Sequence, residues 1–276
     1  MPLYQSSRIR LALVRPLAQS FLNALTQHAP CPPIDAAKAH EQHERYAKLL
    51  QRHVSEQITV PVDENYPDCC FIEDTALVIG DDVVITRIGA ESRRGESKAV
   101  AKVFRALSDR GFGFNIHHLK EPATLDGGDV LQMGGRLFVG QSARSNAEAV
   151  TQLKAILTMP VVSIPVTGGL HLKSVLSALD DRTLLAADTP EARGMAKGIM
   201  AALPVESEPR CVWVPDVISA NVLRLGSILL IQAGFPESEV ILRKLAEELR
   251  LEVIAVDMSE LIKADSALTC CSLLIP

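Results

Sequence analysis

The chain has 276 residues, of which 47% are hydrophobic and 22% are charged, a balance typical of soluble globular proteins. Its formal net charge is −5, so no basic surface predicts a nucleic acid or an anionic membrane as a partner. No apolar run reaches the roughly 18 residues expected of a membrane-spanning helix. We therefore expect one globular domain over residues 1–276.

The N-terminal segment allows two interpretations. Residues 1–27 contain Arg8, Arg10 and Arg15 and no acidic residue, a composition that transit peptides share. Residues 8–16, "RIRLALVRP", alternate between polar and apolar side chains as a half-buried strand does. We favour the strand and expect this segment to belong to the fold.

A pattern of hairpin, amphipathic helix and further strand recurs along the chain. In residues 69–119 two strands flank Gly80 and Asp81, a helix covers about 94–110, and a third strand follows. The same order recurs in residues 128–166, 172–214 and 220–256, with helices at about 145–157, 190–202 and 237–250.

A fifth unit is split between the two ends of the chain. Its first strand would be "LTCCSLLIP", residues 268–276, and its remaining parts are residues 8–15, a helix at about 34–53, and residues 57–62. The units begin near residues 71, 128, 173, 220 and 270, at a spacing typical of closed repeat arrays. We predict an α/β fold with five-fold pseudosymmetry, in which the N- and C-terminal segments close a ring. We favour this ring over the alternative of an open α/β sheet. Closure also removes exposed sheet edges.

Polar and small residues gather where the first strand of each unit begins. In a ring these positions face a common axis, so five segments distant in sequence should meet in one central pocket. The reactive side chains delivered there are Glu73, Asp74, Asp126, His171 and Cys270.

Six cysteines, at positions 31, 69, 70, 211, 270 and 271, show no CxxC spacing. A chain without a secretory signal is expected to keep them reduced, in the cytoplasm. Cys270 and Cys271 are poorly placed to bridge each other, because adjacent side chains diverge. At the start of a strand they should point to opposite faces, so that Cys270 lines the axis and Cys271 packs in the sheet. A zinc site is the competing use, although it needs three or four ligands.

Among the histidines, His171 is the candidate general acid and base, because the repeat places its segment at the axis of the ring. His40 and His43 lie on a very polar predicted helix, where we expect a solvated face. The "HEQHE" run there is not HExxH, since residue 44 is glutamate.

The acidic residues of the pocket predict a cationic ligand. Asp126 could hold the imidazole of His171 in one orientation, or belong only to the tight Asp-Gly-Gly turn. Asp68, Glu73 and Asp74 repel one another unless a cation lies among them, and a planar guanidinium matches several carboxylates. Arg93 and Arg144 suit an anionic group at the other end of that ligand, or are ordinary surface arginines.

The motifs "PDCCFIEDTALV", "ITRIGAESRRGE", "ATLDGGDVL", "FVGQSARSN", "GLHLKS" and "SALTCCSLLI" together resemble the dimethylarginine dimethylaminohydrolase family of the pentein (amidinotransferase-type) superfamily. The resemblance covers nearly the whole chain, with the motifs in the same order. It implies a five-fold pseudosymmetric α/β propeller.

The resemblance also implies a role for each residue of the site. Cys270 matches the nucleophile, His171 the general acid and base, and Asp126 the carboxylate that orients the histidine. The positions that match substrate contacts are Glu73 and Asp74 for the guanidinium, Asp68 near the amino-acid end, Arg93 and Arg144 for the carboxylate, and the backbones of Ala264 and of Pro30 in the lid. The family often has leucine at the lid position, so Pro30 is a departure.

The implied reaction is hydrolysis of Nω-methylated arginine to citrulline and an amine, with no metal or organic cofactor and with zinc only as an inhibitor. The implied partner is a small cationic amino acid, and a homodimer is the assembly to test for. Two alternatives stay open. One is another guanidine-modifying activity of the superfamily: arginine or agmatine deimination, or amidino transfer. The other is a non-catalytic thiol or zinc-binding protein that uses Cys270, Cys271 and His171.

Overall fold

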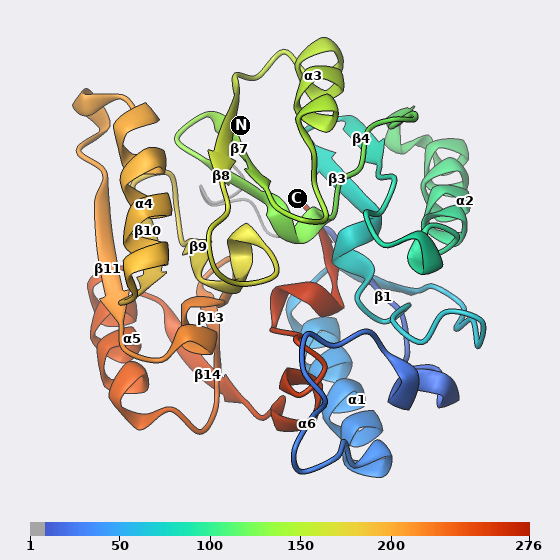
Figure 1. The fold of residues 1–276 in the computed structure, drawn as a ribbon, viewed down its shortest axis with the longest axis horizontal. Helices are drawn as coiled ribbons and strands as arrows, with labels where there is room; N and C mark the ends of the chain where they lie inside the picture. Colours follow the sequence, from blue (N-terminus) through green and yellow to red (C-terminus); the bar gives the residue numbers. More distant parts are fainter. Residues whose placement is uncertain (1–8) are drawn as a thin grey trace.

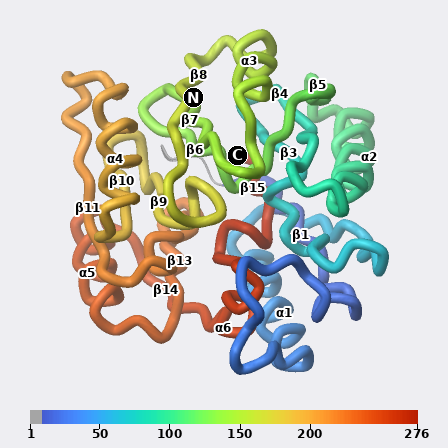
Figure 2. Tube along the Cα trace, viewed as in Figure 1, coloured from blue at the N-terminus to red at the C-terminus, as the bar shows by residue number. Residues whose placement is uncertain are grey.

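The computed structural model describes residues 9–276, which form five three-stranded sheets around a common centre (Figure 1). In each sheet an inner strand runs antiparallel to a middle strand, and the middle strand runs parallel to an outer one. The long helices lie at the periphery, and the C-terminal segment lies near the centre (Figure 2). The predicted ring is confirmed; Arg8, in the predicted first strand, lies outside the described residues.

The units share one order of elements, which is inner strand, middle strand, helix and outer strand. The inner strands are β3 (Ala76–Ile79), β6 (Val130–Met133), β9 (Leu176–Ala178), β12 (Leu223–Leu225) and β15 (Leu273–Ile275). The middle strands are β4 (Asp82–Ile85), β7 (Arg136–Gln141), β10 (Thr183–Ala187), β13 (Ile228–Gln232) and β1 (Leu11–Val14). The outer strands are β5 (Asn115–His118), β8 (Val161–Pro165), β11 (Arg210–Val214), β14 (Glu252–Val256) and β2 (Glu56–Thr59).

The five predicted helices are confirmed, and a short sixth one precedes the last strand. They are α1 (Ala36–His53), α2 (Ser97–Leu107), α3 (Ala147–Ile156), α4 (Pro190–Ala202), α5 (Pro236–Glu248) and α6 (Ser259–Ile262). The predicted helix at 94–110 is shorter as an α-helix, because a single π-type turn follows it and ends at glycines with positive φ.

The last strand of the chain closes the ring. β15 pairs antiparallel with β1, with Leu11 opposite Ile275 and Leu13 opposite Leu273, and β1 pairs parallel with β2. The fifth sheet is therefore built from both ends of the chain, as predicted.

Local sequence determines where the elements start and turn. The side chains of Asp35, Asn146 and Thr189 cap α1, α3 and α4 by accepting a backbone N–H in the first turn. The hairpin between β6 and β7 turns at Gly134 and Gly135, whose φ values of 57° and 68° suit a tight turn that matches the twist of the strands.

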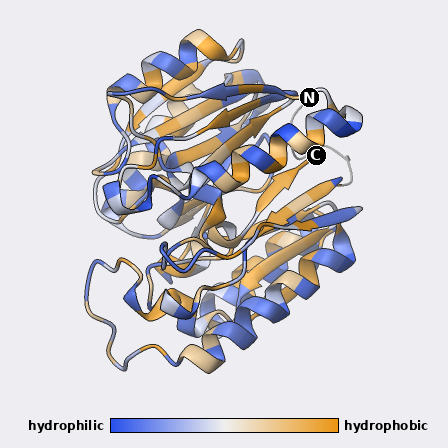
Figure 3. Ribbon diagram, turned by 90° about the vertical axis from the view of Figure 1, so that its right-hand side faces the viewer, coloured by the Kyte–Doolittle hydropathy of each residue, from blue (hydrophilic) through white to orange (hydrophobic). Residues whose placement is uncertain are grey.

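The apolar core lies between the sheets and the helices that cover them. The strands are largely hydrophobic, and the helices show mixed hydrophobic and hydrophilic faces (Figure 3). The core consists of four clusters of buried side chains, which together reach all five sheets. Among residues 9–276 no helix has both the length and the apolar character needed to cross a membrane.

The prediction for His43 is wrong. His40 is exposed, but His43 lies on the inward face of α1 with Ala39, Tyr46 and Leu50 and is buried. Helical periodicity, with apolar residues three and four positions apart, outweighs the polar composition of this helix. Burial lowers the pKa of His43 from 6.5 to about 4, with a further contribution from the charge of His40.

We predict that His43 makes the fold sensitive to acid. Between pH 6.5 and about 4 the unfolded chain protonates this histidine and the folded protein does not. The free energy of unfolding should therefore fall by up to about 3 kcal/mol over that range as the pH falls. His43→Leu should remove this part of the fall, measured by urea unfolding at several pH values. His53→Leu, at the end of the same helix, is the control, and equal pH dependence of wild type and His43→Leu would contradict the prediction.

Candidate active site

The site is built from five short 3₁₀ turns, one immediately before each inner strand. η2 contacts both η9 and η5, η5 contacts η6, and η6 contacts η8, so the turns lie next to one another around the axis. They are η2 (Ile72–Thr75), η5 (Gly127–Asp129), η6 (Leu172–Ser174), η8 (Val217–Ala220) and η9 (Thr269–Cys271). The convergence predicted from the repeat is therefore present.

The local geometry at Cys270 and Cys271 differs from the prediction. The pair belongs to η9 and not to a strand, since β15 begins only at Leu273. Successive side chains in a 3₁₀ turn are about 120° apart, so the two thiols still diverge. Cys270 is half-buried and lines two cavities, whereas Cys271 is fully buried, with its Sγ 3.8 Å from Oγ of Ser266.

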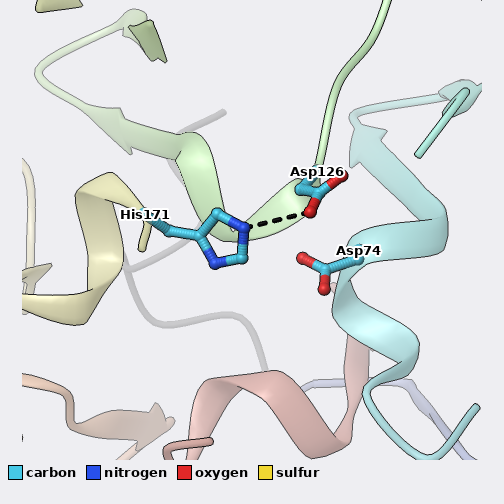
Figure 4. Close-up of side chains that lie close together, drawn as sticks. All are labelled: Asp74, Asp126 and His171. Atoms are coloured by element: carbon cyan, nitrogen blue, oxygen red, sulfur yellow. Dashed lines mark hydrogen bonds and ion pairs between the residues drawn. The ribbon is translucent and has the colours of Figure 1, made fainter. Parts of the chain in front are cut away.

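His171 and Asp126 form a hydrogen-bonded pair, with 3.0 Å between Nε2 and Oδ2 (Figure 4). Asp126 has no exposed surface, and its other oxygen accepts the N–H of Gly89 at 2.7 Å. The other ring nitrogen of His171 lies close to the backbone of Gly128, where a Cβ would be only 2.6 Å from Nδ1. Glycine at 128 is therefore required for the imidazole to fit.

Asp129 positions the turn that carries His171. Its carboxylate is buried and accepts the N–H of Leu172 at 2.9 Å and the hydroxyls of Ser142 and Ser145, both at 2.6 Å. The second aspartate of the "LDGGD" motif thus joins the second unit to the third. The sequence reasoning did not single it out.

Three buried groups share a small space around the imidazole. Ligand atoms of Asp74, Asp126 and His171 all lie within 4.8 Å of one another, and the Asp74 carboxylate points toward the ring (Figure 4). Burial alone would lower the pKa of His171, but the hydrogen bond to Asp126 and the charges of Asp74 and Asp129 outweigh it and raise the pKa to about 9. The histidine is therefore an imidazolium at neutral pH.

Each oxygen of Asp74 has its own donor. Oδ1 accepts the N–H of Gly128 at 3.0 Å, and Oδ2 pairs with Arg93 at 2.9 Å. Burial raises the pKa of Asp74, but the charges of Arg93 and His171 with these hydrogen bonds lower it below its usual value. Among the described residues, the cluster within metal-ligand reach contains neither Cys270 nor Cys271, which gives no support to the thiol and zinc alternative.

Arg93 is occupied by protein groups. Its buried guanidinium forms a bidentate pair with Glu96, at 3.0 and 2.9 Å, and also binds Asp74 and the carbonyl of Phe71. Burial raises the pKa of Glu96 to about 7 although the charge of Arg93 lowers it. The predicted contact of Arg93 with a substrate carboxylate stays a prediction, and any such contact must share this guanidinium with Asp74.

Arg144 is differently placed. Its NH1 is buried and makes no hydrogen bond with the described residues, and it lies 4.0 Å from Oδ2 of Asp126. The side chain lines a small cavity together with Asp68, Arg93 and Ala264, all of them predicted site residues. An unpaired buried guanidinium donor in a cavity is a ready partner for a carboxylate.

Asp68 connects this cavity to the predicted lid. It is buried and accepts the N–H of Leu25 at 3.1 Å; burial raises its pKa while the charges of Arg93 and Arg144 oppose the rise. Leu25, two residues before the predicted lid at residues 27–35, lines the same cavity, and Gln27 of the lid lines its neighbour. Pro30 is half-buried in that segment, and its contact with a ligand stays a prediction.

Glu73 lies at the floor of the site, and both oxygens of its carboxylate have partners in the protein. One oxygen pairs with the ammonium of Lys173, and the other accepts the hydroxyl of Thr269 at 2.9 Å. Asn221 completes this group by donating to the carbonyl of Lys173 and to Thr269, both at 3.0 Å. The sequence reasoning missed Lys173, Thr269 and Asn221, although their places in "LKS", "LTCC" and "ISAN" at the unit starts could have indicated them.

A second, larger cavity of about 250 Å³ adjoins the first. The two share Leu170, His171, Asp265 and Cys270, so the nucleophile candidate faces both spaces. Burial and the charges of Glu73 and Asp74 raise the pKa of Cys270 well above its usual value. Without a cation in the site, Cys270 is a neutral thiol.

Comparison with known proteins places the chain among enzymes that act on guanidines. A family profile described as arginine deiminase matches residues 33–191. N(G),N(G)-dimethylarginine dimethylaminohydrolase of Streptomyces coelicolor is 35% identical over 95% of each chain. The protein of the same name from Pseudomonas aeruginosa is 32% identical over 95% of this chain and 97% of that protein. The structure of a cysteine-to-serine variant of the Pseudomonas enzyme with citrulline has a TM-score of 0.82 at 30% identity, covering 98% of this chain and 100% of that one.

We predict that Asp126 sets the protonation of His171. Asp126→Asn removes the charge that accepts the imidazolium proton, so the pKa of His171 should fall from about 9 toward neutrality. An NMR pH titration with ¹⁵N-labelled histidine measures this directly. Asp82→Asn is the matched control, because Asp82 contacts His117 at the same 3.0 Å on a distant strand pair. A wild-type His171 that titrates near pH 6.5 would contradict the account.

Proposed function

The chain belongs to the dimethylarginine dimethylaminohydrolase family, and we propose on that premise that it hydrolyses Nω-methylated L-arginines to L-citrulline and dimethylamine or methylamine. The observation that carries the proposal is the position of Cys270. The neutral thiol of Cys270 and the imidazolium of His171 line the same two cavities, and the smaller one also holds buried carboxylates and Arg144, whose NH1 makes no hydrogen bond with the described residues.

The substrate itself supplies the cation that the site lacks. Docking a guanidinium beside Asp74 and Cys270 offsets the negative field that keeps the thiol protonated, so Cys270 loses its proton to solvent and the thiolate forms. The delocalised charge makes the guanidinium carbon a weak electrophile, and the carboxylates hold it planar next to the nucleophile.

In the first half-reaction Sγ of Cys270 attacks the guanidinium carbon and a C–S bond forms. His171 donates its proton to the methylated nitrogen, the C–N bond breaks, and the neutral amine leaves a positively charged thiouronium on the cysteine. The raised pKa of His171 suits this step, because the acid must be protonated at the start.

In the second half-reaction the neutral His171 removes a proton from water. The hydroxide attacks the thiouronium carbon and the C–S bond breaks. The proton of the new hydroxyl group passes to the departing thiolate, so citrulline is released and the neutral thiol of Cys270 is restored. These steps use only side chains and water, so we propose that the enzyme needs no metal or organic cofactor. Zinc enters the proposal only as an inhibitor.

We propose that the amino-acid end of the substrate binds at the smaller cavity, because charged side chains line it. We assign the substrate carboxylate to Arg144, whose NH1 makes no hydrogen bond with residues 9–276, with Arg93 as a second contact, and the amino group to Asp68. Ala264 and Pro30 are proposed to contribute backbone contacts. The whole chain is proposed to act as a single catalytic domain.

One specific observation favours a second candidate substrate. The arginine deiminase profile covers residues 33–191, and arginine carries the same guanidinium and the same carboxylate. Agmatine is a poorer fit because it has no carboxylate for Arg144. The compartment that we propose is the cytoplasm, in line with six free cysteines, and a homodimer stays a proposal.

A substrate panel tests the function. Citrulline release from asymmetric dimethylarginine and monomethylarginine should exceed release from arginine, and agmatine should yield no product. Activity confined to arginine or agmatine would overturn the proposal in favour of deimination. Bound zinc with no product from any guanidine would favour a non-catalytic protein.

We predict that the two adjacent cysteines have different roles. Cys270→Ser should lower kcat at least 1,000-fold, on the order seen when a nucleophile is removed, whereas Cys271→Ser should retain most activity because its thiol faces Ser266 in the core. Both variants are assayed for citrulline and checked for folding by thermal unfolding. Equal loss in two folded variants would reverse the assignment.

A further inference from the structure

The fourth unit supplies none of the reactive side chains predicted for the central pocket. Those side chains come from the other four units, as Glu73, Asp74, Asp126, His171 and Cys270. The turn η8 of the fourth unit nevertheless contacts η6, the turn that follows His171. Asn221 comes directly after η8, is only 1% exposed, and lines the larger cavity together with His171 and Cys270. The fourth unit therefore reaches the site through the buried amide of Asn221.

The side chain of Asn221 bridges the turn that carries the nucleophile and the turn that follows the histidine. Its Oδ1 accepts the backbone N–H of Thr269 at 3.1 Å, and its Nδ2 donates to the hydroxyl of Thr269 and to the carbonyl of Lys173, both at 3.0 Å. Thr269 immediately precedes Cys270, and Lys173 lies two residues after His171. One amide is therefore hydrogen-bonded to both η9 and η6.

The groups around Asn221 require one orientation of its amide. The N–H of Thr269 can only donate and the carbonyl of Lys173 can only accept, so the amide oxygen must face the first and the nitrogen the second. Because Nδ2 donates to the hydroxyl of Thr269, that hydroxyl gives its own proton to Glu73, at 2.9 Å. Hydrogen bonds in such a chain polarise and strengthen one another. Alanine at position 221 would make none of the side-chain bonds.

Glu73 also links the two turns, but it does so through side chains. Its carboxylate pairs with the ammonium of Lys173 and accepts the hydroxyl of Thr269. The hydrocarbon stem of a lysine is flexible, so this link tolerates movement of the backbone. Asn221 instead binds a backbone N–H of one turn and a backbone carbonyl of the other, so it holds the main chain itself.

We propose that Asn221 is a positioning residue that sets the separation of Cys270 and His171 for the chemical step. The inference rests on the proposed function, in which Cys270 attacks the guanidinium carbon and His171 protonates a nitrogen bonded to that carbon. A displacement of about 1 Å in such a constellation can lower the rate about 100-fold. The described residues that line the smaller cavity do not include Asn221, so binding of the amino-acid end should not depend on it.

Asn221→Ala tests the proposal. It should lower kcat for asymmetric dimethylarginine roughly 100-fold, the loss expected of a misplaced nucleophile, and change KM by less than about 3-fold. Circular dichroism and thermal unfolding establish that the variant is folded at the assay temperature. A folded variant with the wild-type kcat overturns the inference, and so does a change confined to KM.

Gln42→Ala is the matched control. Gln42 is 3% exposed, and its amide accepts the N–H of Glu260 and donates to the hydroxyl of Ser259, both at 2.9 Å. It is not among the residues of 9–276 that line the two cavities. This variant also loses buried hydrogen bonds of an amide and should be less stable, but it should keep the wild-type kcat. An equal fall of kcat in both folded variants would indicate a general loosening of the fold and overturn the inference.

A second pair of variants covers the case in which Asn221→Ala does not fold. Thr269→Val removes the hydroxyl that joins Asn221 to Glu73 and should lower kcat roughly 10-fold, on the scale of one hydrogen bond. Thr269→Ser keeps the hydroxyl and should recover most of that loss, which a role in packing alone would not explain. Equal kcat values in the two Thr269 variants overturn the inference.

The wild type separates this inference from the proposed function. Wild-type release of citrulline from asymmetric dimethylarginine supports the function, and a kcat that is then unchanged in Asn221→Ala overturns the positioning role alone. A wild type that releases no citrulline from any guanidine overturns the proposed function and this inference with it.

Discussion

The antiparallel pairing of β15 with β1 joins the two ends of the chain, and the rest of the architecture depends on it. Without these hydrogen bonds the fifth sheet has no inner strand, and η9 has no fixed place beside η2. The same pairing allows Cys270 to lie six residues from the last residue of the chain and still face the centre of the molecule. After closure, one edge of each inner strand pairs with the middle strand of its sheet, and the other edge faces the axis of the ring.

Closure of the ring brings together acidic groups whose negative charges repel one another. Cationic side chains in the site offset these charges. Asp74 pairs with Arg93, Glu73 with Lys173 and Asp126 with His171. Burial of an unpaired carboxylate would cost several kcal/mol, so these pairs are a condition for the fold as well as for chemistry. The negative field that remains at Cys270 raises the pKa of its thiol, and a guanidinium is the natural complement to that field.

Much of this could be predicted from the sequence because the fold repeats. The five hairpins and helices follow from periodicity, and the split fifth unit follows from two incomplete ends. The positions of Cys270, His171 and Asp126 at the axis follow from the repeat alone. The chemistry of histidine and carboxylate made His171 the candidate acid and base and Asp126 its candidate partner, and the family resemblance then implied the full set of roles with Cys270 as nucleophile.

Other features depend on three-dimensional contacts that no local pattern encodes. The 3₁₀ turn at Cys270 replaces the expected start of a strand, and β15 begins only at Leu273. His43 is buried by the inward face of α1 despite the polar composition around it, and Arg93 is held by Glu96 and Asp74 across the first unit. Lys173 and Asn221 contribute to the floor only once the ring is closed.

The central claim is that Cys270 attacks a guanidinium carbon and carries the product half of the substrate as a thiouronium. Rapid acid quench during turnover of asymmetric dimethylarginine, followed by peptide mass spectrometry, tests it most directly. The account predicts a substrate-dependent mass increase on the C-terminal peptide, at Cys270, that is absent in Cys270→Ser. An adduct on Cys271, or steady citrulline formation with no cysteine adduct at any quench time, would contradict it.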